Sequence, residues 1–410
     1  MERIVHRPNL QAALQRVKSN KGSPGIDGMT VDELSAHLRE HWQAIREQLL
    51  AGTYQPQPVK RQLIPKSGGG MRELGIPTVL DRFIQQTMLQ VLQSDLDGSF
   101  SRHSHGFRPG RNAHGAIREA QRYIQEGRRW VVDVDLEKFF DCVNHDVLME
   151  RLARRIRDRR VLVITRRYLE AGVMAYDGVV MERYEGTPQG GPLSPLLANV
   201  LLDEVDKELE RRGHSFVRYG DDCNVYVRSR RAGERVMRLL RRLFTGLKLR
   251  VNESKSAVDL ARRRKILGYS FWTAQGGVVK RRVAKKALQM MKDRVRLITR
   301  RSRGRSIEQV ATELLSYLVG WKEYYRLADT SKVFAELDEW IRHRLRVLHL
   351  KHWKRGRTIY RELCARGLSA HSAASVAAHG RRWWKNSGML IHMALPTRHF
   401  DQLGVPRLAT

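Results

Sequence analysis

The sequence predicts an α+β fold, in which strands and helices are mixed along the first two thirds of the chain and helices alone follow. Two observations predict it. Residues 216–227, which read FVRYGDDCNVYV, hold two runs of aromatic and β-branched residues interrupted at Gly220-Asp221-Asp222, a pattern typical of a β-hairpin. From Val283 onward, apolar residues recur at helical spacing along three segments, residues 283–298, 307–318 and 333–345.

The charge balance predicts a polyanionic partner. The 410 residues include 76 Lys and Arg against 43 Asp and Glu, a formal net charge of +33. Because Arg clusters are spread along the chain, a nucleic-acid backbone is favoured over a single small anion, with a membrane surface as the rival. The chain has no run of about 18 apolar residues and no apolar signal-peptide core at its start, so we expect a soluble cytoplasmic protein without membrane contact. The three cysteines, Cys142, Cys223 and Cys364, lie too far apart for a zinc module and argue against a disulfide framework.

The first 50 residues predict a pair of helices separated by a Gly/Pro-rich loop. Leu10, Leu14 and Val17 share one face of the first helix, and the loop is KGSPGIDG at residues 21–28. Thr30 and Glu33 form a capping-box pattern at the start of the second helix. A purely structural role suits both helices.

Residues 58–77 predict a two-stranded ribbon whose tip is the flexible basic segment Lys66-Ser-Gly-Gly-Gly70. Such a ribbon could lay Lys66 and Arg72 over a triphosphate, because both cations match its charge and glycine lets the backbone close on phosphate oxygens. An ordinary exposed hairpin is the alternative.

A helix at residues 81–92 and a loop at residues 104–112 come next in the chain. Arg108 and Arg111 lie in that loop, where they could touch a phosphate backbone or simply be solvated. The residues alone leave these two alternatives open.

Acidic residues at the ends of predicted strands indicate a metal site. Residues 130–136 predict a strand that places Asp133 and Asp135 on the same face. A strand ending in Asp135 beside a hairpin tipped by Asp221 and Asp222 supplies three carboxylates, the number that two-cation phosphoryl transfer requires. Adjacent carboxylates repel each other, and Mg²⁺ would offset the repulsion with its preferred oxygen ligands. A solvated Gly-Asp turn and a strand-end cap are the alternatives.

Residues 186–195, which read GTPQGGPLSP, predict a restricted loop that opens a helix capped by Ser194, with Gln189 facing whatever lies at the helix start. Such a loop before a helix is also commonplace without any function. After the hairpin we expect a basic amphipathic helix at residues 228–242 and strand segments at residues 248–255 and 265–272.

Together these blocks resemble bacterial group II intron reverse transcriptase/maturases, closest to the short types without an endonuclease domain. The resemblance is carried, in order, by IPKSGGGMRELGIPTVLDRFIQQ, SHGFRPGRNAHGAI, VVDVDLEKFFDCVNHD, GTPQGGPLSPLLANVLLDEVD, RYGDDCNVYV, NESKSAV, ILGYSF and LVGWKEYYRLAD. It implies a right-hand polymerase of fingers, palm and thumb, with an antiparallel palm sheet. The implied division is an N-terminal extension at residues 1–57, fingers and palm at 58–278, a helical thumb or maturase domain at 279–350, and a basic DNA-binding region at 351–410.

The resemblance also implies roles for individual residues. Asp135, Asp221 and Asp222 match the three catalytic aspartates that bind two Mg²⁺ ions, which Mn²⁺ could replace, whereas Asp133 matches no ligand position. Phe140 matches the residue that stacks under the incoming sugar and excludes a ribose 2′-OH. The remaining matches are Lys66 and Arg72 with the triphosphate and Gln189 with the nascent base pair. Apart from these matches, we expect Arg108, Arg111 and Lys255 to contact nucleic acid. The family usually has Ala where this chain has Gly220, so we expect activity to survive and any cost to fall on precision or rate.

The implied function is an RNA-directed DNA polymerase that copies RNA into cDNA and helps its intron to splice and to move by retrohoming. The implied partners are group II intron RNA, an RNA template with a DNA primer, target DNA and dNTPs, and the oligomeric state is left open. Two alternatives remain. The chain could act mainly as an RNA-folding cofactor, or it could be a domesticated relative that serves DNA repair or phage defence.

Overall fold

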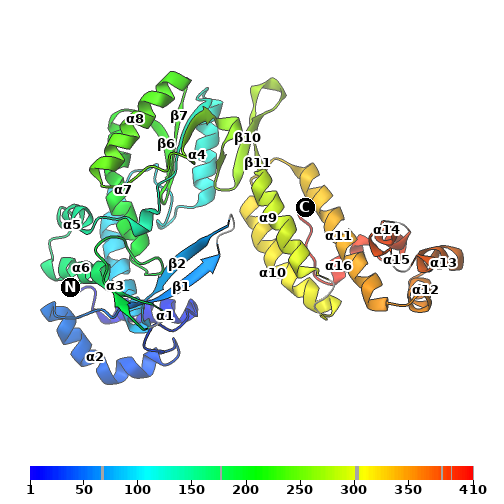
Figure 1. Ribbon diagram of the computed structural model, residues 1–410, viewed down its shortest axis with the longest axis horizontal. Coiled ribbons are helices and arrows are strands. Elements are labelled where there is room, and N and C mark those ends of the chain that lie inside the picture. Colours follow the sequence, from blue (N-terminus) through cyan, green and yellow to red (C-terminus); the bar gives the residue numbers. More distant parts are fainter. Residues whose placement is uncertain (66–68, 176–177, 301–303, 380–381, 389, 410) are drawn as a thin grey trace. The chain divides into compact units, whose positions relative to one another are not determined.

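A computed structural model describes residues 1–65, 69–175, 178–300, 304–379, 382–388 and 390–409. The chain forms two compact units, Met1–Arg264 and Lys265–Thr410 (Figure 1). The fold class is α+β, as predicted. Within the described residues, every helix is too short or too polar to cross a lipid bilayer.

A four-stranded sheet, here called the central sheet, organises the first unit. Its strand order is β6-β7-β3-β8 and every neighbouring pair is antiparallel, which confirms the predicted hairpin and the antiparallel sheet. The strands are β6 (Ser215–Tyr219), β7 (Asp222–Val227), β3 (Trp130–Val134) and β8 (Ala257–Leu260).

Helices cover the central sheet (Figure 1). Helix α4 (Ala113–Gln125) packs on β6 and β7, α7 (Ser194–Arg211) packs on β6, and α8 (Arg230–Gly246) packs on β3, β7 and β8. The sequence of α8 explains its side of the contact, because Val236, Leu240 and Phe244 recur every four residues and are buried. Burying each such side chain contributes roughly 1.5 to 3 kcal/mol, so the stripe fixes which face of α8 meets the sheet.

A second sheet of the first unit contains the predicted ribbon. Strand β1 (Val59–Pro65) pairs antiparallel with β2 (Met71–Ile76), and Arg72 stands opposite Ile64. On its other side β1 pairs in parallel with β4 (Val173–Met174), which pairs with β5 (Val180–Met181). The prediction for Lys66 falls outside the described residues.

The other helices of the first unit share one apolar core with the central sheet. Helix α1 packs on α3, α2 packs on α6, and α5 packs on α6 and α7. The helices are α1 (Arg7–Ser19), α2 (Leu34–Ala51), α3 (Val79–Leu96), α5 (His145–Ala153) and α6 (Arg159–Glu170), with short 3₁₀ turns at Asp97–Ser99, Phe139–Asp141 and Ala261–Arg263.

Two helix starts differ from the prediction. Helix α2 begins at Leu34 because the Glu33 carboxylate accepts hydrogen bonds from both the backbone N and the hydroxyl of Thr30, at 2.7 and 2.8 Å, and the hydroxyl is then not free to cap the helix. Ser194 is the first residue of α7 and caps nothing, since its hydroxyl donates to the carbonyl of Pro188 at 2.8 Å.

The strand predicted at residues 248–255 is also absent from the described structure. Val251 makes one isolated bridge to Leu136, and turns occupy half of the segment. The strand in this part of the chain is β8, which begins at Ala257.

The second unit opens with a three-stranded antiparallel sheet and continues as helices. The strand order is β11-β10-β9, formed by β9 (Lys265–Ile266), β10 (Tyr269–Thr273) and β11 (Val279–Val283). The three predicted helices are confirmed as α9 (Lys285–Ile298), α10 (Ile307–Tyr325) and α11 (Ser331–Trp353) (Figure 1). Shorter helices follow: α12 (Gly356–Ala365), α13 (Ala370–Ala378), α14 (Trp383–Ser387), α15 (Ile391–Ala394) and α16 (Thr397–Gln402).

Candidate active site

The hairpin between β6 and β7 ends in a two-residue turn. Tyr219 pairs with Asp222, which leaves Gly220 and Asp221 as the two loop residues. Gly220 has a φ of +65°, and a glycine in the left-handed region at the first loop position is the signature of a type II′ turn. The turn therefore holds Asp221 at the tip, while Asp222 is the first residue of β7.

Asp135 comes to the same edge of the central sheet. Val134 is the last residue of β3 and pairs with Cys223, so Asp135 follows at the level of the hairpin tip. Burial raises the pKa of the Asp221 carboxyl, the negative charge of Asp135 adds to this rise, and the charges of Arg72 and Arg218 oppose it. The structure thus brings Asp135 and Asp221, 86 positions apart in the sequence, close enough for their charges to interact.

The environment of Asp135 suits a bound cation. Its Oδ2 atom is buried and, among the described residues, accepts no hydrogen bond. The ammonium of Lys255 lies 3.2 Å from this oxygen, as an ion pair without hydrogen-bond alignment, so a positive charge already stands beside it. Within the described part of the chain, however, no three acidic, histidine or cysteine side chains form a group that could hold a metal ion by themselves. A bound Mg²⁺ would complete its coordination with water and substrate phosphates, as this ion commonly does in proteins.

A cavity of about 540 Å³ in the first unit collects three of the four predicted nucleotide-binding residues. Arg72 reaches it from β2, Phe140 from the 3₁₀ turn after β3, and Gln189 from the loop before α7. Its volume lies within the usual range for small-molecule sites, roughly 300 to 1,000 Å³. Arg72 connects the cavity with the hairpin tip, because it lines the cavity and its charge also acts on the Asp221 carboxyl.

Local contacts hold two of these side chains. The Gln189 side-chain amide donates to Asp141 Oδ1 at 3.0 Å, which ties the loop before α7 to the turn that carries Phe140. The Phe140 ring packs edge-on against Phe139, with ring centroids 5.1 Å apart, and the Phe140 carbonyl accepts from the backbone N of Thr187.

The sequence alone did not reveal four further polar residues of this cavity. Arg16 and Asn20 come from the end of α1, and Arg82 and Gln86 lie one turn apart on α3. Arg82 donates from NH2 to the Ser23 carbonyl at 2.6 Å, and its buried Nε has no hydrogen-bond partner among the described residues. The four-residue spacing of Arg82 and Gln86 is the signal that would have placed both on one face.

The prediction that Arg108 contacts nucleic acid is wrong, and so is its solvated alternative. The guanidinium is buried and donates to both carboxylate oxygens and the carbonyl of Asp97, and to the carbonyls of Ser101 and Ser104. These bonds use the whole fork of donors, so Arg108 holds its own loop together. Arg111 is half-buried and bonds the Arg102 carbonyl, and Lys255 is exposed beside Asp135, so their expected contacts stay predictions.

Comparison with known proteins identifies the family. Residues 64–271 match the family model described as reverse transcriptase (RNA-dependent DNA polymerase), and residues 288–366 match the group II intron, maturase-specific domain. The chain belongs to the group II intron reverse transcriptase/maturase family. This confirms the resemblance drawn from the sequence blocks and, with it, the polymerase fold.

Curated relatives match this chain over about half of its length, and the chain spans less than two thirds of the length of each of them. Protein YkfC of Escherichia coli is 39% identical over 217 residues, which are 51% of this chain and 57% of that protein. The group II intron-encoded protein LtrA of Lactococcus lactis is 38% identical over 207 residues, 50% of this chain and 34% of LtrA. A putative COX1/OXI3 intron 1 protein of Saccharomyces cerevisiae is 33% identical over 201 residues, 49% of this chain and 24% of that protein.

Among solved structures, a chain of the partial Cas6-RT-Cas1–Cas2 complex is 27% identical to this chain. The match covers 60% of this chain and 42% of that chain, with a TM-score of 0.38.

Proposed function

We propose that the chain is an RNA-directed DNA polymerase, which copies RNA into cDNA by phosphoryl transfer at a site for two Mg²⁺ ions. The observation that supports this best is the convergence of Asp135 and Asp221 beside the cavity lined by Arg72, Phe140 and Gln189. Metal ions bound there would supply positive charge to the phosphoryl group during transfer, and Mn²⁺ could replace Mg²⁺. Asp222, the neighbour of Asp221 at the start of β7, is the third proposed ligand.

The chain's own residues would orient the nucleotide. Arg72, with Lys66, is proposed to hold the triphosphate, because Arg72 lines the cavity from β2 and Lys66 is a second cation of the same segment in the sequence. The flat ring of Phe140 would lie under the sugar and offers no hydrogen bond to a ribose 2′-OH, which would favour dNTPs. Gln189, held by Asp141, would lie beside the new base pair.

A primer-extension assay on an RNA template with a DNA primer tests the proposal. We expect Asp221→Asn to lower the extension rate by about a hundredfold or more, since a neutral amide binds Mg²⁺ poorly. Asp133→Asn is the matched control, because Asp133 lies on β3, the strand that leads to Asp135, but pairs with Arg264 at 2.6 Å. We expect the control to keep most of its cDNA synthesis. Wild-type rates in Asp221→Asn would remove the metal assignment.

We further propose that the second unit binds group II intron RNA to assist splicing and retrohoming, and that the basic segment at residues 351–410 contacts target DNA. The match of residues 288–366 to the maturase-specific domain supports the RNA contact. The four-part domain division and a cytoplasmic location remain proposals as well. A splicing assay with the intron that flanks the coding sequence tests the RNA role: added protein should speed splicing at moderate salt, and Asp221→Asn should leave that speed unchanged.

A further inference from the structure

Arg218 of β6 is a buried cation beside the hairpin tip, with a side chain that is 2% exposed. Its main partner is Asp206 of α7, whose side chain is fully buried. Arg218 Nε donates to both carboxylate oxygens at 2.9 Å, and NH2 donates to Oδ2 at 2.6 Å. A buried ion pair is weak evidence that the pair stabilises the fold. The other contacts of Arg218 indicate whether the residue has a further role.

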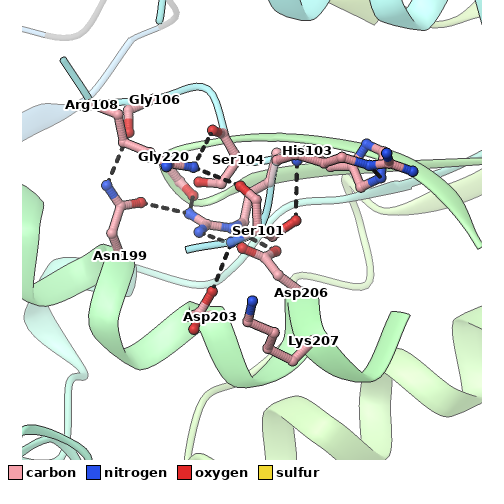
Figure 2. A network of polar contacts seen from close by, with 12 residues as sticks. Ser101, His103, Ser104, Gly106, Arg108, Asn199, Asp203, Asp206, Lys207 and Gly220 are labelled. Carbon is pink, nitrogen blue, oxygen red and sulfur yellow. Dashed lines mark hydrogen bonds and ion pairs between the residues drawn. The ribbon is translucent and has the colours of Figure 1, made fainter. Parts of the chain in front are cut away.

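The remaining donor of Arg218 points to the turn that carries the carboxylates. NH1 donates to the carbonyl of Gly220 at 2.9 Å and to Asn199 Oδ1 at 2.9 Å. Figure 2 shows Asn199, Asp206 and Gly220 gathered in this network. Because Gly220 directly precedes Asp221, the planar guanidinium links helix α7 to the position of a proposed metal ligand.

A second segment holds the same turn from another direction. Asn199 donates from Nδ2 to the carbonyl of Gly106 at 3.0 Å (Figure 2). The backbone of residues 103–105 pairs with β6, since Arg218 N donates to the His103 carbonyl and His105 N donates to the Arg218 carbonyl. A Cβ on Gly106 would lie 2.3 Å from the backbone N of Gly220, so the two backbones touch and leave the turn little freedom to move.

We propose that Arg218 is a positioning residue that fixes Asp221 through the Gly220 carbonyl, and so sets the affinity of the site for divalent cations. The proposal rests on the proposed function, because it takes Asp221 to be a metal ligand. Partners that hold a ligand in place usually change metal affinity when they are replaced, typically by 10- to 100-fold.

Arg218→Lys separates positioning from the ion pair. Lysine keeps a positive charge for Asp206, but its single ammonium cannot span Asp206, Asn199 and Gly220 as the guanidinium fork does. Mn²⁺ is titrated into the protein alone and its binding is followed by electron paramagnetic resonance. The ion of interest binds to the wild-type protein but not to Asp221→Asn, and the titration gives its dissociation constant. We expect Arg218→Lys to raise that constant by about tenfold, and to raise similarly the Mg²⁺ concentration that half-saturates primer extension.

Arg342→Lys is the matched control. Arg342 of α11 is, like Arg218, a fully buried arginine among the described residues, and it pairs with Asp338 and Asp401 within the second unit. Replacing Arg342 tests whether losing any buried guanidinium changes Mn²⁺ binding. We expect the Mn²⁺ dissociation constant of this variant to equal that of the wild-type protein. An unchanged Mn²⁺ constant in Arg218→Lys, or an equal rise in Arg342→Lys, would overturn the positioning role.

Asn199→Ala decides the question if Arg218→Lys does not fold. This substitution removes the amide that accepts from Arg218 Nη1 and donates to the Gly106 carbonyl. It leaves the ion pair between Arg218 and Asp206 intact. We expect a smaller rise of the Mn²⁺ constant in the same direction, and no rise would overturn the proposal. The two proposals fail in different ways. If the wild-type protein shows no primer extension that depends on Asp221, the polymerase function is contradicted. If Arg218→Lys and Asn199→Ala show normal primer extension and a normal Mn²⁺ dissociation constant, only the role of Arg218 is contradicted.

Discussion

Gly220 is the residue whose conformation decides how the carboxylates are presented. Its φ of +65° is a conformation that an L-residue adopts only with strain, and the ring of Phe107 lies over it. A Cβ at this position would lie 3.0 Å from Phe107 Cε2. An alanine at this position would therefore have to be accommodated by a shift of Phe107.

We expect Gly220→Ala to lower the free energy of unfolding by about 1 to 2 kcal/mol from backbone strain, with a further loss from the Phe107 contact. Urea unfolding measures the change. Gly213→Ala is the control, because Gly213 has a similar φ of +69° and open space where its Cβ would lie. If both variants lose the same stability, the Phe107 ring does not constrain the turn.

At the ends of strands, the sequence could predict individual site residues, because a metal site needs acidic side chains there. Asp135 and Asp221 were predicted this way, because acids that follow apolar strands are visible in the pattern. Arg108 was mispredicted because an exposed Arg and a buried one look alike in a loop sequence, and its Asp97 partner comes from another segment. Asn20 and Arg82 were missed because only the packing of α1 on α3 brings them to the cavity.

At the scale of elements, Glu119 connects α4 to the segment that supports the hairpin. Its Oε1 bonds His103 Nδ1 at 2.7 Å and Tyr123 OH at 2.6 Å, and its Oε2 bonds His105 Nε2 at 2.7 Å. Burial by itself would raise the pKa of Glu119, but these hydrogen bonds hold the pKa well below its usual value of 4.5. The carboxylate therefore stabilises the fold at pH values above about 4.5, and this contribution is lost as the pH falls further.

We expect Glu119→Gln to lower stability at pH 7 and to flatten the loss of stability between about pH 4.5 and 3, because an amide cannot be protonated in that range. Urea unfolding across this pH range measures both effects. Glu126→Gln, at the residue that follows the same helix, serves as the control, since Glu126 is exposed and pairs with Arg128 and Arg122. An identical pH profile for wild type and Glu119→Gln would contradict the role given to these bonds.

Long elements were easier to predict than short ones. Helices α10 and α11 are 19 and 23 residues long, and the apolar residues at helical spacing along 307–318 and 333–345 leave little ambiguity about the helix or its buried face. Residues 248–255 contain the same apolar and polar residue types as a strand, but no neighbouring strand pairs with them there except at Val251. Pairing partners are a tertiary property, so the sequence did not distinguish this segment from β8.

At the scale of the whole molecule, the net charge of +33 is the dominant property. We expect the affinity for single-stranded RNA to fall by about a hundredfold or more between 50 and 200 mM salt, because each phosphate contact releases a bound counterion. Filter binding at several salt concentrations measures the slope. Affinity that stays flat over this range would contradict binding through the backbone.

Arg111→Ala refines the same measurement. If Arg111 contacts one phosphate, as the sequence predicts, the variant lowers the slope of log affinity against log salt by about one. A slope equal to that of wild type would show that Arg111 serves only its bond to the Arg102 carbonyl.

The proposed metal ligands and much of the cavity wall come from different elements of the fold. The proposed metal ligands come from β3 and the β6–β7 turn, whereas much of the polar wall comes from α1 and α3. If the cavity binds the nucleotide as proposed, substitutions at Arg16, Asn20 or Gln86 should alter which substrate is accepted and leave the proposed metal ligands in place. A mutant library designed to change nucleotide or template preference would therefore target these helices, which are distant in sequence from the aspartates.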